Sequence, residues 1–119
     1  MSSKRRVYRV AEQIQILVAN QLQKVADPRF HLVTVTSVVV SPDLRIAKVY
    51  WVVTGDAERI EEVSDAFDGA RALFRKSVGR ELGVRIAPEL IFYYDDTLDT
   101  HDEIERLMLK VRERESSQR

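Results

Sequence analysis

The sequence predicts an α+β domain in which a three-stranded mixed sheet carries helices on one face. Two runs rich in β-branched residues are separated by a short Pro-Asp turn, which indicates an antiparallel hairpin. A long stretch with apolar residues three or four apart then leads to a third strand-like run. A helical crossover leaves the strands that it connects parallel, so the sheet is mixed. The chain has 119 residues, of which 45% are apolar, and this is the size of one compact domain.

The first predicted element is a helix over residues 5–25. Pro28 follows its end, and the residue before a proline is disfavoured in the helical region. The hairpin strands are predicted at residues 33–41 and 45–54, with Pro42 and Asp43 in the turn. The apolar stripe of the helix consists of Val10, Ile14, Leu17, Val18, Leu22 and Val25.

One long helix or two consecutive helices are predicted over residues 57–82, with a bend at Gly69 and a C-terminal cap at Gly83. Residues 86–94 form the third strand; its Phe92 is expected in the core, and the environments of Tyr50 and Tyr93 stay open. The apolar side of the long helix is expected to consist of Ile60, Val63, Phe67, Ala70, Leu73, Phe74, Val78 and Leu82.

A last amphipathic helix follows a capping-box pattern, Thr100-x-x-Glu103, and its apolar positions are Ile104, Leu107, Met108 and Val111. We therefore expect residues 1–96 to form the globular domain. Residues 97–119 are expected to be a C-terminal helix with a frayed polar tail and not a second domain.

Several classes of protein are excluded or disfavoured by composition. The chain has no cysteine, which excludes disulfides and thiolate metal sites, and its two histidines are far apart. No apolar run is long enough to span a membrane, and the first residues lack a secretory signal, so the expected compartment is the cytoplasm. Ser41 has no histidine placed to activate it, and the aspartates between residues 95 and 102 fit a solvated turn. We expect no enzyme, no cofactor and no metal.

The charges cancel overall, 19 basic against 19 acidic, but they are unevenly spread. Residues 1–50 carry eight basic and three acidic side chains, a net charge of +5, and residues 70–85 carry five basic side chains against Glu81 alone. The cations of the first helix lie in its first turns, where the helix dipole disfavours them and where a phosphate would relieve the cost. The same holds for Arg71 if a new helix starts near Ala70. The plainer alternative is that these cations form a solvated helix face.

Four segments resemble the ribosome-binding factor A family. The most specific is residues 85–95, RIAPELIFYYD, which is similar to that family's R-x-x-P-E-L-x-F-x-x-D segment. Residues 9–14 (RVAEQI), 27–36 (DPRFHLVTVT) and 41–50 (SPDLRIAKVY) resemble three further family segments in the same order.

This resemblance implies a type II KH-like domain that binds the immature 30S subunit and its 16S rRNA, and is linked to 16S rRNA processing, late 30S maturation and cold adaptation. It implies an Ala-x-Gly kink between two helices, which here maps to Ala70-Arg71-Ala72 without the glycine, and Gly69 is expected to supply the bend. We expect a monomer off the ribosome. The expected RNA contacts are Arg5, Arg6, Arg9, Arg45, Lys48, Arg71, Arg75, Lys76, Arg80 and Arg85.

Two other functions remain open. A small α+β interaction module could form a homodimer through its open sheet face, which the zero net charge would permit. A small enzyme of ferredoxin-like shape is disfavoured, because no acid/base pair or anion-cradling motif is visible.

Overall fold

The computed structural model describes residues 2–97 and 107–114. The elements in chain order are α1 (Ser2–Lys24), the 3-10 helix η1 (Pro28–Phe30), β1 (Thr34–Val40), β2 (Ile46–Val52), α2 (Ala57–Leu82) and β3 (Glu89–Tyr94). All the helices and strands predicted within residues 2–97 are present, with bounds within three residues of those expected. Residues 107–114 are helical, as predicted for the last helix, whereas its capping box lies outside the described residues.

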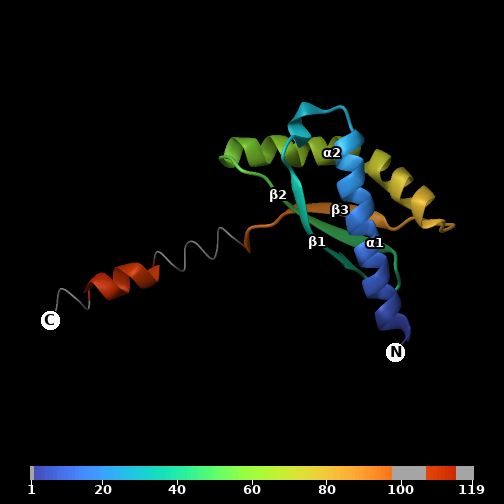
Figure 1. Ribbon diagram of the computed structural model, residues 1–119, viewed down its shortest axis with the longest axis horizontal. Coiled ribbons are helices and arrows are strands. Elements are labelled where there is room, and N and C mark those ends of the chain that lie inside the picture. The colour runs from blue at the N-terminus through green and yellow to red at the C-terminus, as the bar shows by residue number, and fades with distance from the viewer. Residues whose placement is uncertain (1, 98–106, 115–119) are drawn as a thin grey trace.

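The three strands form one sheet in the order β1-β2-β3. β1 pairs with β2 antiparallel, and β2 pairs with β3 parallel, so the predicted mixed sheet is confirmed. α1 packs mainly against β1 and α2 against β3, and the two helices cross over the same face of the sheet (Figure 1). None of the described helices meets the length and hydropathy needed to cross a membrane.

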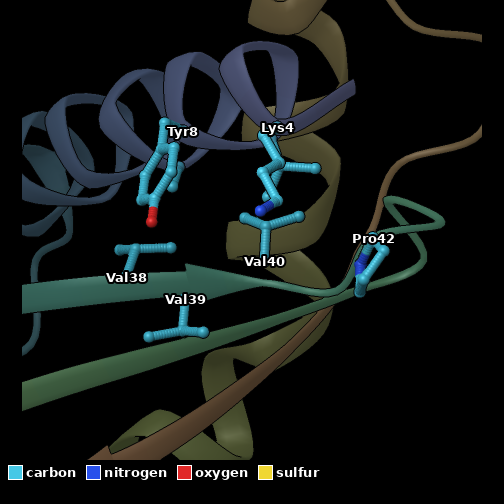
Figure 2. A pocket seen from close by; sticks show the side chains of 8 residues that line it. Lys4, Tyr8, Val38, Val39, Val40 and Pro42 are labelled. Atoms are coloured by element: carbon cyan, nitrogen blue, oxygen red, sulfur yellow. The ribbon is translucent and has the colours of Figure 1, made fainter. Parts of the chain in front are cut away.

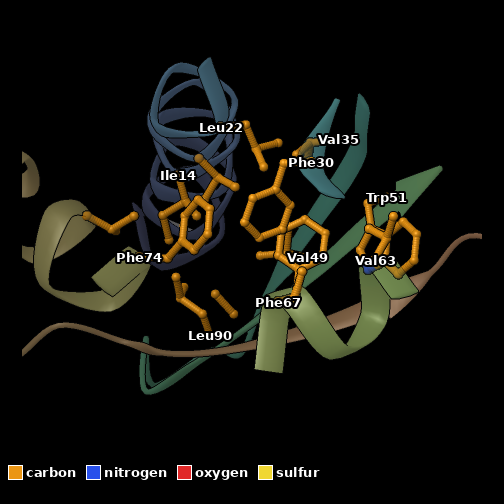
Figure 3. Packing of buried hydrophobic residues seen from close by; sticks show 14 of the residues in the cluster. Ile14, Leu22, Phe30, Val35, Val49, Trp51, Val63, Phe67, Phe74 and Leu90 are labelled. Atoms are coloured by element: carbon orange, nitrogen blue, oxygen red, sulfur yellow. The ribbon is translucent and has the colours of Figure 1, made fainter. Parts of the chain in front are cut away.

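The core lies between the helices and this face of the sheet, and its centre is the ring of Phe67 (Figure 3). Phe67 stacks on Phe92 with centroids 4.4 Å apart and also contacts the rings of Phe30, Trp51 and Phe74. The core placement predicted for Phe92 is therefore confirmed. A second link joins the helices, because the partly buried Ser77 Oγ of α2 donates to Gln21 Oε1 of α1 at 3.0 Å.

The other face of the sheet carries no helix among the described residues. Lys48, Val39 and Tyr93 are exposed there, and the rings of Tyr50 and Tyr93 stack with centroids 5.7 Å apart across β2 and β3. The alternation along β2 explains this division: Ala47, Val49 and Trp51 are fully buried, while the residues between them point to the open face.

Of the two arrangements that the sequence left open, the structure has one helix, which stays hydrogen-bonded from Ala57 to Leu82. It changes direction between its green and yellow halves (Figure 1). A Cβ at Gly69 would meet nothing within 4 Å, so this glycine is not required by close packing. The predicted apolar side is wrong for Leu73, which is 47% exposed, because it lies about 100° around the helix from the fully buried Phe74, at the edge of the buried face.

Candidate nucleic-acid interface

Four segments that are far apart in the sequence meet at one end of the domain. They are the N-terminal part of α1, the turn between β1 and β2, the last turns of α2, and the loop of residues 83–88 that leads into β3. Between them lies a hollow of about 690 Å³, here called the arginine hollow. Its lining includes Arg6, Arg45, Arg75 and Arg85.

A second hollow, of about 540 Å³, is lined by the same loop and by α2. It shares Arg75 and Arg85 with the arginine hollow and adds Lys76 and Arg80. Six of the ten cations predicted to contact RNA therefore surround one loop, and we call these six residues the basic end. Its members are Arg6, Arg45, Arg75, Lys76, Arg80 and Arg85.

Contacts with α2 hold this loop in place. Gly79 lies so close to Ala87 that a Cβ added at Gly79 would be 2.8 Å from the Ala87 Cβ. The Arg75 guanidinium donates two hydrogen bonds to the Ala87 carbonyl, from Nη2 at 3.0 Å and from Nε at 3.3 Å. Gly83 caps α2 in the left-handed conformation, with its N–H bonded to the Gly79 carbonyl. The loop is thereby fixed at its start and near its end.

The turn between β1 and β2 is equally constrained. Asp43 Oδ1 accepts hydrogen bonds from Ser41 Oγ at 2.7 Å and from the Arg45 N–H at 3.1 Å, and these bonds lower the pKa of the Asp43 carboxyl. Leu44, also in the lining of the arginine hollow, has a φ of +61°, a conformation that side chains larger than Gly or Asn rarely adopt. The Arg45 carbonyl accepts from the Glu89 N–H at 2.8 Å, which ties the turn to the start of β3.

The cations of the basic end are mostly not paired with carboxylates, and the guanidinium of Arg75 is bonded to a backbone carbonyl instead. Within residues 2–97 and 107–114, only Arg80 of the six lies within 4.0 Å of an acidic side chain, that of Glu81. All six residues are exposed. Asp43 and Glu89 also line the arginine hollow, so its cations outnumber its carboxylates by four to two. Because the cations are not neutralised within the fold, a positive surface remains for a polyanion.

Four predicted contacts lie elsewhere. Arg5 and Arg9 are exposed on α1 but do not line either hollow, and Lys48 lies on the open face of the sheet. Arg71 pairs with Asp68 at 3.4 Å, one turn earlier on α2. Since α2 is continuous through residues 69–72, its N–H groups are already bonded there, and Gly69, Ala70 and Ala72 do not begin a new helix. The dipole argument therefore applies to α1 alone.

A further hollow, of about 310 Å³, lies between α1 and β1. Figure 2 shows Lys4 and Tyr8 of α1 extending toward Val38 and Val40, with Pro42 at the end of the strand. Its lining is mostly apolar and contains a single cation, Lys4. This hollow does not have the charge that a phosphate site requires.

Sequence reasoning missed Gly79, which sets the distance between α2 and the loop. A signal was present, because a glycine inside a helix costs about 1 kcal/mol relative to alanine and so indicates a packing requirement. It also missed the apolar lining of the arginine hollow, which Leu44 and Ile86 help to form, because nothing in the local pattern places these residues together.

Within the described part of the chain no cluster of residues could hold a metal ion.

Comparison with known proteins gives a consistent result. A family model described as ribosome-binding factor A matches residues 6–108. The ribosome-binding factor A of Frankia casuarinae is 38% identical over 117 residues, which cover 98% of this chain and 70% of that protein. The crystal structure of ribosome-binding factor A from Thermus thermophilus aligns with a TM-score of 0.66 and 25% identity over 74% of this chain and 94% of that one. This structural match confirms the predicted type II KH-like fold.

A second set of Thermus thermophilus coordinates is a homology model of ribosome-binding factor A fitted into a cryo-EM map of its complex with the 30S subunit. It aligns with a TM-score of 0.60 and 26% identity, and covers 71% of this chain and 90% of that one.

Proposed function

The chain belongs to the ribosome-binding factor A family, and from this premise we propose that it binds the 30S ribosomal subunit through 16S rRNA. The proposal takes support from the related Thermus thermophilus protein, whose coordinates were fitted into a map of a 30S complex. We assign the rRNA contact to the basic end. No catalytic step is part of this function, since the protein acts by holding a conformation of the RNA.

The observation that carries this assignment is the convergence of six exposed cations from four segments around one tethered loop. Five of the six are arginines, whose planar guanidinium groups bind phosphate oxygens in pairs. Counterion release from the RNA backbone then supplies the binding free energy, and the placement of the cations around the loop selects the shape of the RNA. Arg5, Arg9, Lys48 and Arg71 are proposed as peripheral contacts that add charge without belonging to the basic end.

The finer parts of the function follow the family. We propose that the protein acts on immature 30S subunits, assists 16S rRNA processing and late maturation, and contributes to growth in the cold. In this proposal residues 1–96 are the RNA-binding domain, the protein works in the cytoplasm as a monomer when it is off the ribosome, and it needs no cofactor. Release then depends on maturation of the subunit or on another factor.

The test is co-sedimentation of the full chain with purified 30S subunits and with 70S ribosomes. We expect the protein to travel with free 30S subunits and not with 70S ribosomes. A variant with Arg6→Gln, Arg45→Gln and Arg85→Gln should leave the 30S fraction while keeping its melting temperature. The control replaces Lys24, Lys110 and Arg112, which are exposed, line neither hollow and are not among the proposed contacts, with glutamine. If both triple variants lose 30S binding to the same extent, the assignment of the rRNA contact to the basic end is wrong.

The homodimer alternative is tested in the same preparation. A dimer through the open sheet face would show a mass that rises with protein concentration, and Tyr93→Ser, an exposed position on that face, would abolish the rise. We expect a monomer mass throughout.

A further inference from the structure

The arginine hollow combines cations with an apolar floor, which phosphate binding alone does not require. Besides its four arginines it is lined by Val10, Leu44, Leu82, Val84 and Ile86. We propose that this hollow receives the base of a single unpaired nucleotide of the bound RNA, while the surrounding guanidinium groups hold its phosphates. The inference rests on the proposed function and specifies which part of the RNA the protein recognises.

The exposure of the apolar residues supports a base as the ligand. Ile86 is 77% exposed and Val84 is 44% exposed, although both belong to a loop whose Ala87 packs on α2. Neither side chain contributes much to the core at these exposures. A flat nucleobase that covers them would remove this apolar surface from water, at roughly 25 cal/mol per Å². The volume, about 690 Å³, lies within the usual range for small-molecule sites.

The carboxylates of the hollow indicate which part of the nucleotide enters. Asp43 and Glu89 line it together with the arginines. A phosphate inside the hollow would be repelled by these two groups, whereas the polar edge of a base can donate hydrogen bonds to them. The arginines can take the phosphates and also stack on the plane of the base. The expected pose therefore has the base inside and the sugar-phosphate chain along the arginines.

The hollow is formed before any ligand binds, which lowers the cost of ordering it. Two hydrogen bonds from Arg75 to the Ala87 carbonyl hold the loop, and the bond from the Glu89 N–H to the Arg45 carbonyl holds the turn between β1 and β2. Leu44 is held in its left-handed conformation within this frame. Backbone strain of this kind persists where the surroundings determine it, and it is common at binding sites.

The position of the hollow separates it from the kink that the family resemblance points to. The kink positions Ala70–Ala72 lie in the middle of α2, whereas the arginine hollow lies at its last turns. A base in a duplex cannot reach the hollow without unpairing, which costs a few kcal/mol, while a base that is already unpaired enters without this cost. The protein is thus expected to distinguish RNA with an unpaired nucleotide from continuous duplex.

The experiment measures binding of the full chain to three fluorescent RNA probes: a short unstructured strand, the same strand with abasic sites at its centre, and a blunt duplex. Ile86→Ser should weaken binding of the intact strand by roughly fivefold or more, the low end of what the loss of one base contact costs. It should leave the abasic strand and the duplex unchanged. Ile16→Ser is the matched control, because Ile16 is a 61% exposed apolar residue on α1 that does not line the hollow. Melting temperatures of both variants check the fold.

Failure of the inference differs from failure of the proposed function. If Ile86→Ser has no effect on any probe, or weakens all three equally, no base enters the hollow, and the rRNA-binding function still stands as long as Arg85→Gln weakens binding. If the wild-type chain binds neither these probes nor 30S subunits, the proposed function itself is wrong. Adenosine 5′-monophosphate that binds as tightly as the intact strand would make this a free-nucleotide site and overturn the assignment to RNA.

Discussion

Thr36 Oγ donates a 2.6 Å hydrogen bond to Asp95 Oδ2, and this bond joins two residues that are 59 positions apart. Thr36 lies at the irregularity in β1, where the register shifts between Val35 and Ser37, and Asp95 is the residue after β3. The Asp95 N–H in turn donates to the Trp51 carbonyl of β2 at 2.7 Å. One aspartate therefore links all three strands at one end of the sheet.

This aspartate predicts a pH dependence of stability. Hydrogen bonds from Thr36 and then from Thr97 lower the pKa of the Asp95 carboxyl in the folded state. Because the folded pKa lies below the unfolded value of about 3.9, the stabilisation is complete above that pH and is lost as the pH falls through the folded pKa. Asp95→Asn should therefore lower the melting temperature at neutral pH and flatten its decline in acid.

Thermal unfolding monitored by circular dichroism across the acid range measures this effect. Asp27 and Asp43 also have pKa values that are lowered by hydrogen bonds, so Asp95→Asn should keep part of the slope of melting temperature against pH. Asp96→Asn changes the same chemical group at the exposed next residue and is the control. A slope in Asp95→Asn identical to that of the wild type would show that the bond to Thr36 does not contribute.

Two glycines of α2 should respond in opposite directions to alanine. At Gly79 the new Cβ would lie 2.8 Å from the Ala87 Cβ, so the loop of residues 83–88 must move and stability should fall. At Gly69 the Cβ would meet nothing within 4 Å, and alanine should stabilise the helix by about 0.5–1 kcal/mol. Urea denaturation compares the two. Gly79→Ala should also weaken RNA binding, because it displaces Arg85, and a stabilising Gly79→Ala would contradict the close approach.

Single cations of the basic end should change the salt dependence of RNA binding. Arg45→Gln or Arg85→Gln removes one phosphate contact, so the slope of log K against log salt should become shallower by about 1. Lys24→Gln, at the far end of α1, removes the same charge away from the basic end and should leave the slope unchanged. Fluorescence anisotropy titrations at several salt concentrations provide the slopes. Equal slopes for all three variants would mean that only net charge matters.

Phe67 should be among the most sensitive core positions. Its ring contacts four other aromatic rings with centroid distances between 4.4 and 5.8 Å. Phe67→Ala removes these contacts and leaves a cavity, at a cost of about 3–5 kcal/mol. That is a large part of the 5–15 kcal/mol that is typical of a whole domain, so the variant should be partly unfolded at growth temperature. Phe67→Leu should cost less, and a smaller loss in Phe67→Ala than in Phe67→Leu would be inconsistent with this packing.

Local residue patterns in the sequence were enough to predict the helices and strands and their order along the chain. The β-branched runs produced β1 and β2, and the helical spacing of Ile14, Val63 and Phe74 identified the sides of the helices that are buried. They failed at Leu73, which lies about 100° around the helix from Phe74 and so at the edge of the buried face, where an apolar residue can stay exposed. They also left open whether the long helix is continuous, and the structure has a single helix over Ala57–Leu82.

The sequence by itself determined the fold class, the order of the helices and strands along the chain and the set of cations, because each of these depends on neighbours along the chain. Only the tertiary structure decided which cations act together. Arg6, Arg45, Arg75 and Arg85 come from four separate segments, and they meet because β3 returns beside β2 while Gly79 lets the intervening loop lie against α2. Long-range packing of this kind has no signature within one stretch of sequence, which is why the hollow and its apolar floor appeared only in three dimensions.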